Sequence, residues 1–257
     1  MSNSAMLFFC PHCGAQGAHK HGLNTQRKTR YKCKHCFKTF TRRTKKIISG
    51  SKLTDTQWRE AIKLFCFRAG CSGADLSRYF GWNAKTGQRV NRILRTLVQE
   101  LEPTIIDGVS EWDEAVPIKN QWVIGGVSRN TRQCLLRCIP NRREMYLSGF
   151  VNKYSDPEAP FVCTDEHASY CGVVNRLSVC HAREYVNRQM RFVHTNQIEG
   201  VWGHLKPLGK HIYRGFPRST LPMYLSEFMF RYNIRDYETR CSILYALLSR
   251  KSHTLLV

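Results

Sequence analysis

Acidic residues are scarce in this chain of 257 residues. Only 19 Asp and Glu stand against 40 Lys and Arg, so the formal net charge is +21. A cationic surplus of this size exceeds what solubility requires, and it predicts a polyanionic partner, with nucleic acid favoured. Because acids are few, each carboxylate that falls in apolar surroundings becomes a candidate functional group.

The chain also lacks the features of membrane and secreted proteins. It has no long apolar run and no basic amphipathic anchor, so we expect no membrane partner. Residues 1–9 lack the layout of a signal peptide, which predicts a cytoplasmic protein. Twelve cysteines in that setting predict reduced thiols and no disulfides.

Four of the cysteines form two knuckles, Cys10-Pro-His-Cys13 and Cys33-Lys-His-Cys36, with 19 residues between them. This spacing is typical of a zinc ribbon, in which four thiolates complete a tetrahedral site for one structural Zn²⁺. Four unconnected cysteines are disfavoured, because so small a segment has little core without a metal. We therefore predict a zinc ribbon over residues 1–46. The other eight cysteines have no such spacing and are predicted to be buried thiols: Cys66, Cys71, Cys134, Cys138, Cys163, Cys171, Cys180 and Cys241.

Basic residues are concentrated around the two knuckles. They are Lys20, His21, Arg27, Lys28, Arg30, Lys32, Arg42, Arg43, Lys45 and Lys46. A solvated basic face is the alternative interpretation, but so many cations beside a zinc ribbon favour a phosphate-binding surface.

Residues 52–102 carry the pattern of three helices. The first begins near Thr54 or Asp55, a short second helix covers 74–80 and ends at Gly81, and a third begins near Asn83. This order is typical of a helix-turn-helix, with the third helix as the recognition helix. The residues expected on its exposed side are Lys85, Thr86, Gln88, Arg89, Asn91 and Arg92. Such side chains read base edges and phosphates, although a plain three-helix bundle with a solvated face is the alternative.

From residue 105 to 257 the pattern becomes mixed. Strands are expected over 109–113, 121–127, 133–139, 160–163 and 177–180, with helices over 143–153 and 194–206 and further helices toward the end of the chain. This arrangement predicts a mixed α/β sheet covered by helices.

Three carboxylates stand out in this region. Asp113 and Asp165 each end a predicted strand, and Glu199 lies on the 194–206 helix. On that helix Asn196, Glu199 and Lys206 are three and seven residues apart, so they share a face. Converging carboxylates repel one another unless a cation neutralises them, and hard oxygen ligands select Mg²⁺ or Mn²⁺. Two such ions suit phosphodiester chemistry. The alternative is that each acid merely ends a strand or lies on a surface.

The chain resembles the Merlin-like bacterial insertion-sequence transposases over nearly its whole length. The resemblance follows from the zinc ribbon, the helix-turn-helix, Trp112-Asp113-Glu114, Cys163-Thr164-Asp165, the stretch from His194 to Lys206, and Arg231-Tyr232-Asn233-Ile234-Arg235. It implies an RNase H-like catalytic domain of the DDE class over 105–257.

By this resemblance Asp113 and Asp165 are the first two metal ligands and Lys206 holds the DNA phosphate beside the scissile bond. The third ligand is open between Glu199 and Asn196; we prefer Glu199, because a carboxylate is the better magnesium ligand. Glu114 and Glu166 are expected to point away. The basic loop that includes Lys210 and Arg214 is expected to hold DNA.

The expected function is a DNA transposase that binds terminal inverted repeats, cleaves the ends and transfers the strands into target DNA. Two ends must be cut together, so a homodimer or larger assembly is expected. A transcription regulator without catalysis and a metal-dependent nuclease without strand transfer are the two alternatives. The sequence leaves open the repeat, the target preference, the copy-and-paste or cut-and-paste route and whether this copy is active.

Overall fold

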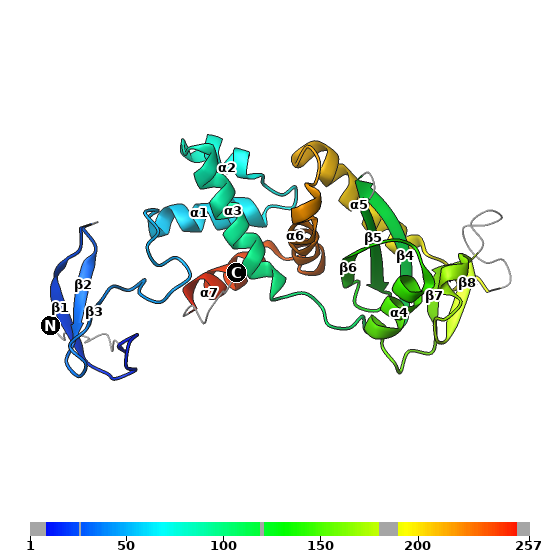
Figure 1. Cartoon of the computed structure of the whole chain (residues 1–257), viewed down its shortest axis with the longest axis horizontal. Helices are drawn as coiled ribbons and strands as arrows, with labels where there is room; N and C mark the ends of the chain where they lie inside the picture. Colours follow the sequence, from blue (N-terminus) through cyan, green and yellow to red (C-terminus); the bar gives the residue numbers. More distant parts are fainter. Residues whose placement is uncertain (1–8, 26, 119–120, 180–189, 251–257) are drawn as a thin grey trace. The chain divides into compact units, whose positions relative to one another are not determined.

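The computed structural model describes residues 9–25, 27–118, 121–179 and 190–250 (Figure 1). By its contacts the chain divides into two compact units, which are described separately. One comprises Met1–Glu60 with Ile243–Val257, and the other comprises Ala61–Ser242.

The first unit contains a small antiparallel sheet. Its strands are β1 (Ala18–Leu23), β2 (Thr29–Cys33) and β3 (Thr39–Phe40), in the order β1-β2-β3. The buried core around this sheet comprises Cys10, Tyr31, Cys33 and Phe40. So small a core supplies little hydrophobic stabilisation, which agrees with a fold that depends on a metal.

Three helices follow, α1 (Asp55–Cys66), α2 (Gly73–Phe80) and α3 (Ala84–Gln99). Local capping explains where they begin and end. Ser72 and Asp75 form a capping box at the start of α2, Gly81 ends α2 with a φ of +67°, and the Asn83 side chain accepts from Thr86 N at the start of α3. One expectation for α3 is wrong: Asn91 is buried, and its Nδ2 donates to Cys71 O at 2.7 Å.

The second sheet has five strands, β4 (Ser110–Ile118), β5 (Gln121–Ser128), β6 (Cys134–Ile139), β7 (Val162–Asp165) and β8 (Arg176–Val179). Their order is β6-β5-β4-β7-β8. The first three strands in the sequence are antiparallel neighbours, as predicted, whereas β7 pairs parallel to β4 and β8 pairs parallel to β7.

Helices cover both faces of this sheet. Trp112 of β4 packs edge-on against Phe150 of α4 (Glu144–Tyr154). On the opposite face, the ring of Trp202 in α5 (Asn196–Pro207) lies so close to Gly125 that a Cβ there would meet it at 2.6 Å. The mixed sheet and its helices fit an RNase H-like domain.

The remaining elements complete the chain. They are the 3₁₀ helices η1 (Ala168–Tyr170) and η3 (Arg218–Thr220), the π-helix η2 (Leu208–Ile212), and the helices α6 (Leu221–Asn233) and α7 (Tyr237–Ser249). Pro207 is the last residue of α5, and the chain continues from it directly into η2. Within the described residues, no helix is both long enough and apolar enough to span a membrane.

The cysteines outside the knuckles are free thiols where they are described. Five are buried as predicted: Cys66, Cys71, Cys134, Cys163 and Cys241. Two predictions are wrong, because Cys138 is only half-buried and Cys171, in the turn after η1, is exposed. Cys180 lies outside the described residues.

Candidate active site and nucleic-acid interface

Asp113 and Asp165 lie level with each other on neighbouring strands. The parallel register pairs Ser110 with Val162 and Glu111 with Cys163, so two residues further along Asp113 comes opposite Asp165. Oxygen atoms of Asp113, Glu114 and Asp165 lie within 4.8 Å of one another. The structure therefore brings together the two aspartates that the sequence singled out.

Glu114 also belongs to this cluster, against expectation. Strand alternation does turn it to the face opposite Asp113, where its Oε2 accepts from Tyr170 Oη at 2.5 Å and its Oε1 forms an ion pair with Arg142. However, β4 is paired with β7 only at Ser110 and Glu111. Beyond these pairs the side chains of Asp113 and Glu114 can both reach the end of β7, where Asp165 lies. Glu166 is exposed and lies outside the cluster, as expected.

The electrostatics of this cluster favour a cation. Burial raises the pKa of Asp113 to about 7, the charges of Glu114 and Asp165 add to this rise, and a 2.8 Å hydrogen bond from Trp202 Nε1 to Oδ2 opposes it. Asp165 Oδ1 accepts from His167 N at 3.1 Å. Two such carboxylates fit a divalent cation with a preference for hard oxygen ligands.

Sequence reasoning missed Glu111, which fixes the helix that covers these acids. Its buried carboxylate accepts from Gln197 N at 2.7 Å and from Ile198 N at 3.3 Å, at the amino end of α5. Arg129 Nε donates to the other oxygen at 2.8 Å. Glu111 is two residues before Asp113, on the same face of β4, and this period-2 spacing is the signal that could have found it.

The candidate third ligands occupy different positions on α5. Glu199 precedes Trp202 by three residues and Lys206 follows it by four, so both lie beside the side chain that reaches Asp113. Glu199 is half-buried, whereas Asn196 is exposed and turned further around the helix. Within the described residues the set of acids close enough to share one ion comprises Asp113, Glu114 and Asp165, without Glu199.

The four knuckle cysteines meet at one point. Cys10 Sγ lies 3.6 Å from Cys36 Sγ, and Cys13 Sγ lies 3.8 Å from Cys33 Sγ. Four thiolates bound tetrahedrally at about 2.3 Å from zinc are roughly 3.8 Å apart. The Cys36 N–H donates to Cys33 Sγ and lowers the pKa of Cys33 to about 6. The geometry and chemistry of these residues therefore fit zinc.

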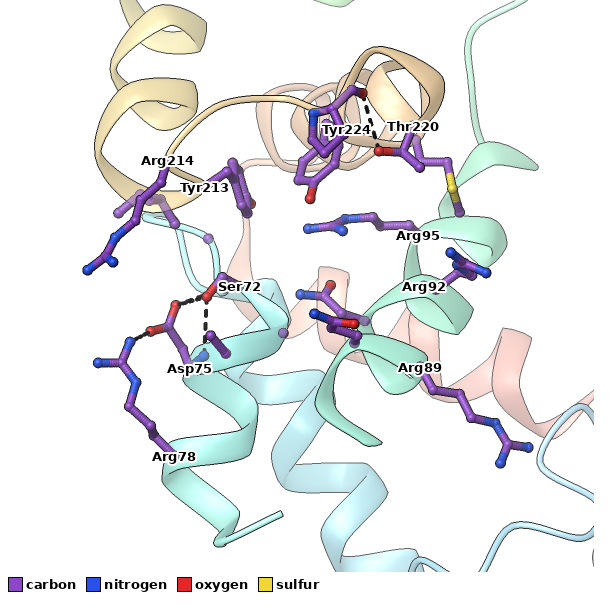
Figure 2. Close-up of a pocket in the computed structure, with 18 of the residues that line it drawn as sticks. Ser72, Asp75, Arg78, Arg89, Arg92, Arg95, Tyr213, Arg214, Thr220 and Tyr224 are labelled. Carbon is purple, nitrogen blue, oxygen red and sulfur yellow. Dashed lines mark hydrogen bonds and ion pairs between the residues drawn. The ribbon is translucent and has the colours of Figure 1, made fainter. Parts of the chain in front are cut away.

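Most of the basic residues predicted on α3 line one cleft of about 820 Å³, termed the α3 cleft (Figure 2). Its basic side chains come from α2, α3 and the chain after α5. Those whose side chains make no hydrogen bond or ion pair within the described residues are Lys85, Arg89, Arg92, His211 and Arg214. Gln88 lines the same cleft, whereas Lys210 is exposed but does not line it. The structure thus joins Arg214 of the predicted basic loop to the predicted recognition helix.

A buried ionic network holds the inner wall of the α3 cleft. Glu227 of α6 accepts from Arg95 Nε at 2.6 Å and from Tyr213 Oη at 2.6 Å, and it forms an ion pair with Arg231. The Arg95 guanidinium also lies 3.8 Å from the centre of the Tyr224 ring. These contacts tie α3 to α6 within the same unit.

The cations predicted on the zinc-ribbon segment differ in how accessible their side chains are. Arg27 is exposed. Lys28 and Arg30 are half-buried, and each donates to a backbone carbonyl, Lys28 Nζ to Ser51 O at 3.5 Å and Arg30 Nε to His21 O at 3.1 Å. Of these three, Arg27 is therefore the most accessible to a phosphate.

Residues 116–233 match the family model described as the ISXO2-like transposase domain. The matched segment contains Asp165, Asn196, Glu199 and Lys206, and it begins three residues after Asp113. A search of curated proteins finds no match to the chain.

Proposed function

Since residues 116–233 are a transposase domain of the DDE class, found in insertion-sequence transposases, we propose that this chain cleaves the DNA ends of an insertion sequence and transfers them to target DNA. The observation that carries the proposal is the meeting of Asp113, within β4, and Asp165, at the end of the adjacent parallel strand β7, beneath the helix that bears Glu199. When bound, two Mg²⁺ or Mn²⁺ ions would stabilise the attacking and leaving oxygens of an in-line phosphoryl transfer.

Asp113, Asp165 and Glu199 hold these ions in the proposed site. Glu199 is favoured over Asn196 because it lies one turn from Trp202, whose indole donates to Asp113, whereas Asn196 lies further around α5. Glu114 has both oxygens engaged by Tyr170 and Arg142, so its proposed part is to position the cluster. Lys206, on the same flank as Glu199, would hold the phosphate beside the scissile bond.

The terminal inverted repeat would be bound by α2 and α3 as a helix-turn-helix, with Lys85, Gln88, Arg89 and Arg92 on the recognition helix. The α3 cleft supports this proposal, because its unpaired cations suit a DNA backbone and Gln88 is a type that reads base edges. Arg214 would hold the same DNA. The zinc ribbon, with one structural Zn²⁺ on Cys10, Cys13, Cys33 and Cys36, would add phosphate contacts through Arg27, Lys28 and Arg30, and Lys210 would add another from the loop.

Two further parts of the proposal follow from the reaction. Two element ends have to be cut together, so the working form would be a homodimer or a larger assembly on DNA. The partner is bacterial DNA, so the enzyme would act in the cytoplasm, at the nucleoid.

The test is an assay with labelled end DNA and a target plasmid, in magnesium or in EDTA. We expect magnesium-dependent cleavage followed by a joined product. Binding without cleavage would instead identify a regulator, and cleavage without joining would identify a nuclease.

The third ligand is tested in the same assay by Glu199→Gln and Asn196→Ala, with Glu166→Gln as the matched control, since Glu166 is an exposed acid next to Asp165. Only Glu199→Gln is expected to abolish cleavage. If Asn196→Ala abolishes it and Glu199→Gln does not, the ligand assignment is wrong. Elemental analysis of the purified chain, expected to give one zinc that Cys33→Ser removes, tests the ribbon.

A further inference from the structure

A second basic cleft adjoins η2, and of the residues predicted to hold DNA it contains only His211, from the basic loop after α5. This α6 cleft has a volume of about 720 Å³ and is lined from α5, η2, α6, α7, the β5–β6 turn and the segments that follow α1 and α6. Its exposed basic side chains are Arg68, Arg132, His204, His211 and Arg235. His211 also lines the α3 cleft, so the two clefts flank the same short segment.

The exposed charges of the α6 cleft have no acidic partner among the described residues that line it. The described residues that line it include no Asp or Glu. Arg231, at its floor, is neutralised by Glu227, and Arg240 donates to backbone carbonyls, so these two are structural. The side chains of Arg68, Arg132 and Arg235 make no hydrogen bond or ion pair within the described part of the chain. Uncompensated cations gathered in a concave surface attract a polyanion.

An aromatic wall accompanies these cations. Tyr232 stacks on Phe228 with ring centroids 5.6 Å apart, and both rings line the cleft. Burial raises the pKa of Tyr232, while Arg235 and Arg132 oppose this rise, which agrees with guanidinium groups near its hydroxyl. Phe228 is buried, so Tyr232 is the partly exposed ring of this pair, and cations beside such a ring are typical of surfaces that hold nucleic-acid strands.

Arg132 adds an independent observation. It occupies the β5–β6 turn with a φ of +61°, a left-handed conformation that favours glycine or asparagine. A bulky cation in that conformation carries backbone strain, and such strain persists where a side chain has a task.

The chemistry of the lining indicates which DNA would bind. Apart from its cations and Tyr232, the described lining is apolar and includes no Asn, Gln, Ser or Thr. Such a surface grips phosphates without reading bases. The α3 cleft, in contrast, presents Gln88 and other polar side chains.

The position of the α6 cleft on α5 places it close to the proposed active site. Gly203, a lining residue, is four residues after Glu199 and directly follows Trp202, the donor to Asp113. Residues four apart share a face of a helix, so Gly203 lies beside Glu199. His204, another lining residue, is five residues from Glu199, which turns it roughly 140° around the helix at 3.6 residues per turn. The cleft therefore adjoins the surface of α5 that bears Glu199 and extends from there around the helix.

We propose that the α6 cleft binds the backbone of target DNA, without base recognition, while the α3 cleft holds the element end. The assignment to target DNA rests on the proposed function, because strand transfer requires two DNA segments at one active site. The binding of a DNA backbone by this cleft rests on the charges and aromatic rings alone.

Two variants and a control test this inference in the full chain. Arg235→Glu reverses one cleft charge, and Arg132→Gly removes another while supplying the residue that the φ favours. Lys153→Glu, at an exposed position of α4, is the matched control for charge. Joining of a precleaved end to a plasmid is expected to fall about tenfold for Arg235→Glu and several-fold for Arg132→Gly, while binding of the end duplex changes less than about twofold. The thermal midpoint of Arg132→Gly is expected to equal or exceed that of the unchanged chain. A loss of joining by this variant therefore cannot come from misfolding.

Affinity for an unrelated duplex is measured in parallel, so the inference stays testable if the chain joins no DNA. In that case the proposed function fails, but weaker duplex binding by Arg235→Glu than by Lys153→Glu still supports the cleft as a DNA site. Equal binding by both variants would overturn the proposal that the α6 cleft binds DNA. Loss of end binding with joining intact would overturn its assignment to target DNA.

Discussion

Two carboxylates in the second unit are buried in opposite electrostatic settings. Burial alone raises the pKa of Glu227, but Arg231 and Arg95 reverse this effect and hold it below its usual range. Asp113 has no guanidinium partner within the described residues, and burial beside Glu114 raises its pKa to about 7. Glu227 is thus neutralised by neighbouring arginines, whereas the cluster around Asp113 lacks enough positive charge to balance its carboxylates.

This difference separates a structural acid from a functional one. Glu227 is also surrounded by donors from α3, α6 and the segment after η2, as a group that fixes tertiary structure should be. Asp113 instead lies beside Glu114 and Asp165, close enough for these acids to share a divalent cation. Local charge balance therefore indicates function more reliably here than burial does, since both side chains are withdrawn from solvent.

The largest expected effect comes from Asp113→Asn. Loss of a metal ligand removes several kcal/mol of transition-state stabilisation, so end cleavage is expected to fall at least about 10³-fold. Because Asp113 has no cationic partner to lose, the free energy of unfolding in EDTA is expected to be equal or higher. Single-turnover cleavage and urea unfolding measure the two effects. A variant that cleaves at the normal rate would remove Asp113 from the proposed site.

Glu227→Gln is expected to have the opposite effect on stability. It leaves Arg95 and Arg231 buried beside a neutral group, which should lower the free energy of unfolding by about 3–5 kcal/mol. Because the pKa of Glu227 is lowered by folding, its contribution is present above the unfolded value of about 4.3 and is lost as pH falls through its folded value. The variant should therefore lose less further stability on acidification below about pH 4 than the unchanged chain does.

Urea unfolding at several pH values measures this change. Glu238→Gln, an exposed acid on α7, is the control and should change stability by less than about 0.5 kcal/mol. Equal stability of Glu227→Gln and Glu238→Gln would mean that the buried network contributes nothing to folding.

Local signals in the sequence predicted much of the fold. The short second helix, predicted over 74–80 and ending at Gly81, occupies Gly73–Phe80, and the third begins directly after Asn83 as predicted. Alternating and apolar runs also predicted the bounds of β5 and β6 to within one residue. Signals of this kind act between neighbours in the sequence, and a single chain therefore displays them.

The candidate site was only partly predictable. Asp165 could be selected as the polar end of an apolar strand. The expectation that Asp113 also ends its strand is wrong, because β4 continues to Ile118, but the two acids still meet because their strands are neighbours. The approach of Glu114 depends on where β7 ends, and the capping of α5 by Glu111 joins residues 86 positions apart. The contact of Arg95 with Glu227 spans 132 positions. Such partners are selected by tertiary packing, for which the sequence carries no local pattern.

The smallest expected effect tests the paired and unpaired charges on a single helix. Arg92 and Arg95 are three residues apart on α3, but Arg92 is exposed in the α3 cleft, whereas Arg95 is buried against Glu227. Arg92→Ala is expected to reduce the slope of log affinity against log salt by about 0.9, the contribution of one phosphate, and to leave the free energy of unfolding unchanged. Arg95→Ala is expected to lower the free energy of unfolding by about 3–5 kcal/mol, because Glu227 loses a buried partner. Salt titration of end-duplex binding, with urea unfolding of both variants, measures the contrast. If Arg92→Ala destabilises the fold as much as Arg95→Ala does, the division between structural and DNA-facing cations on α3 is wrong.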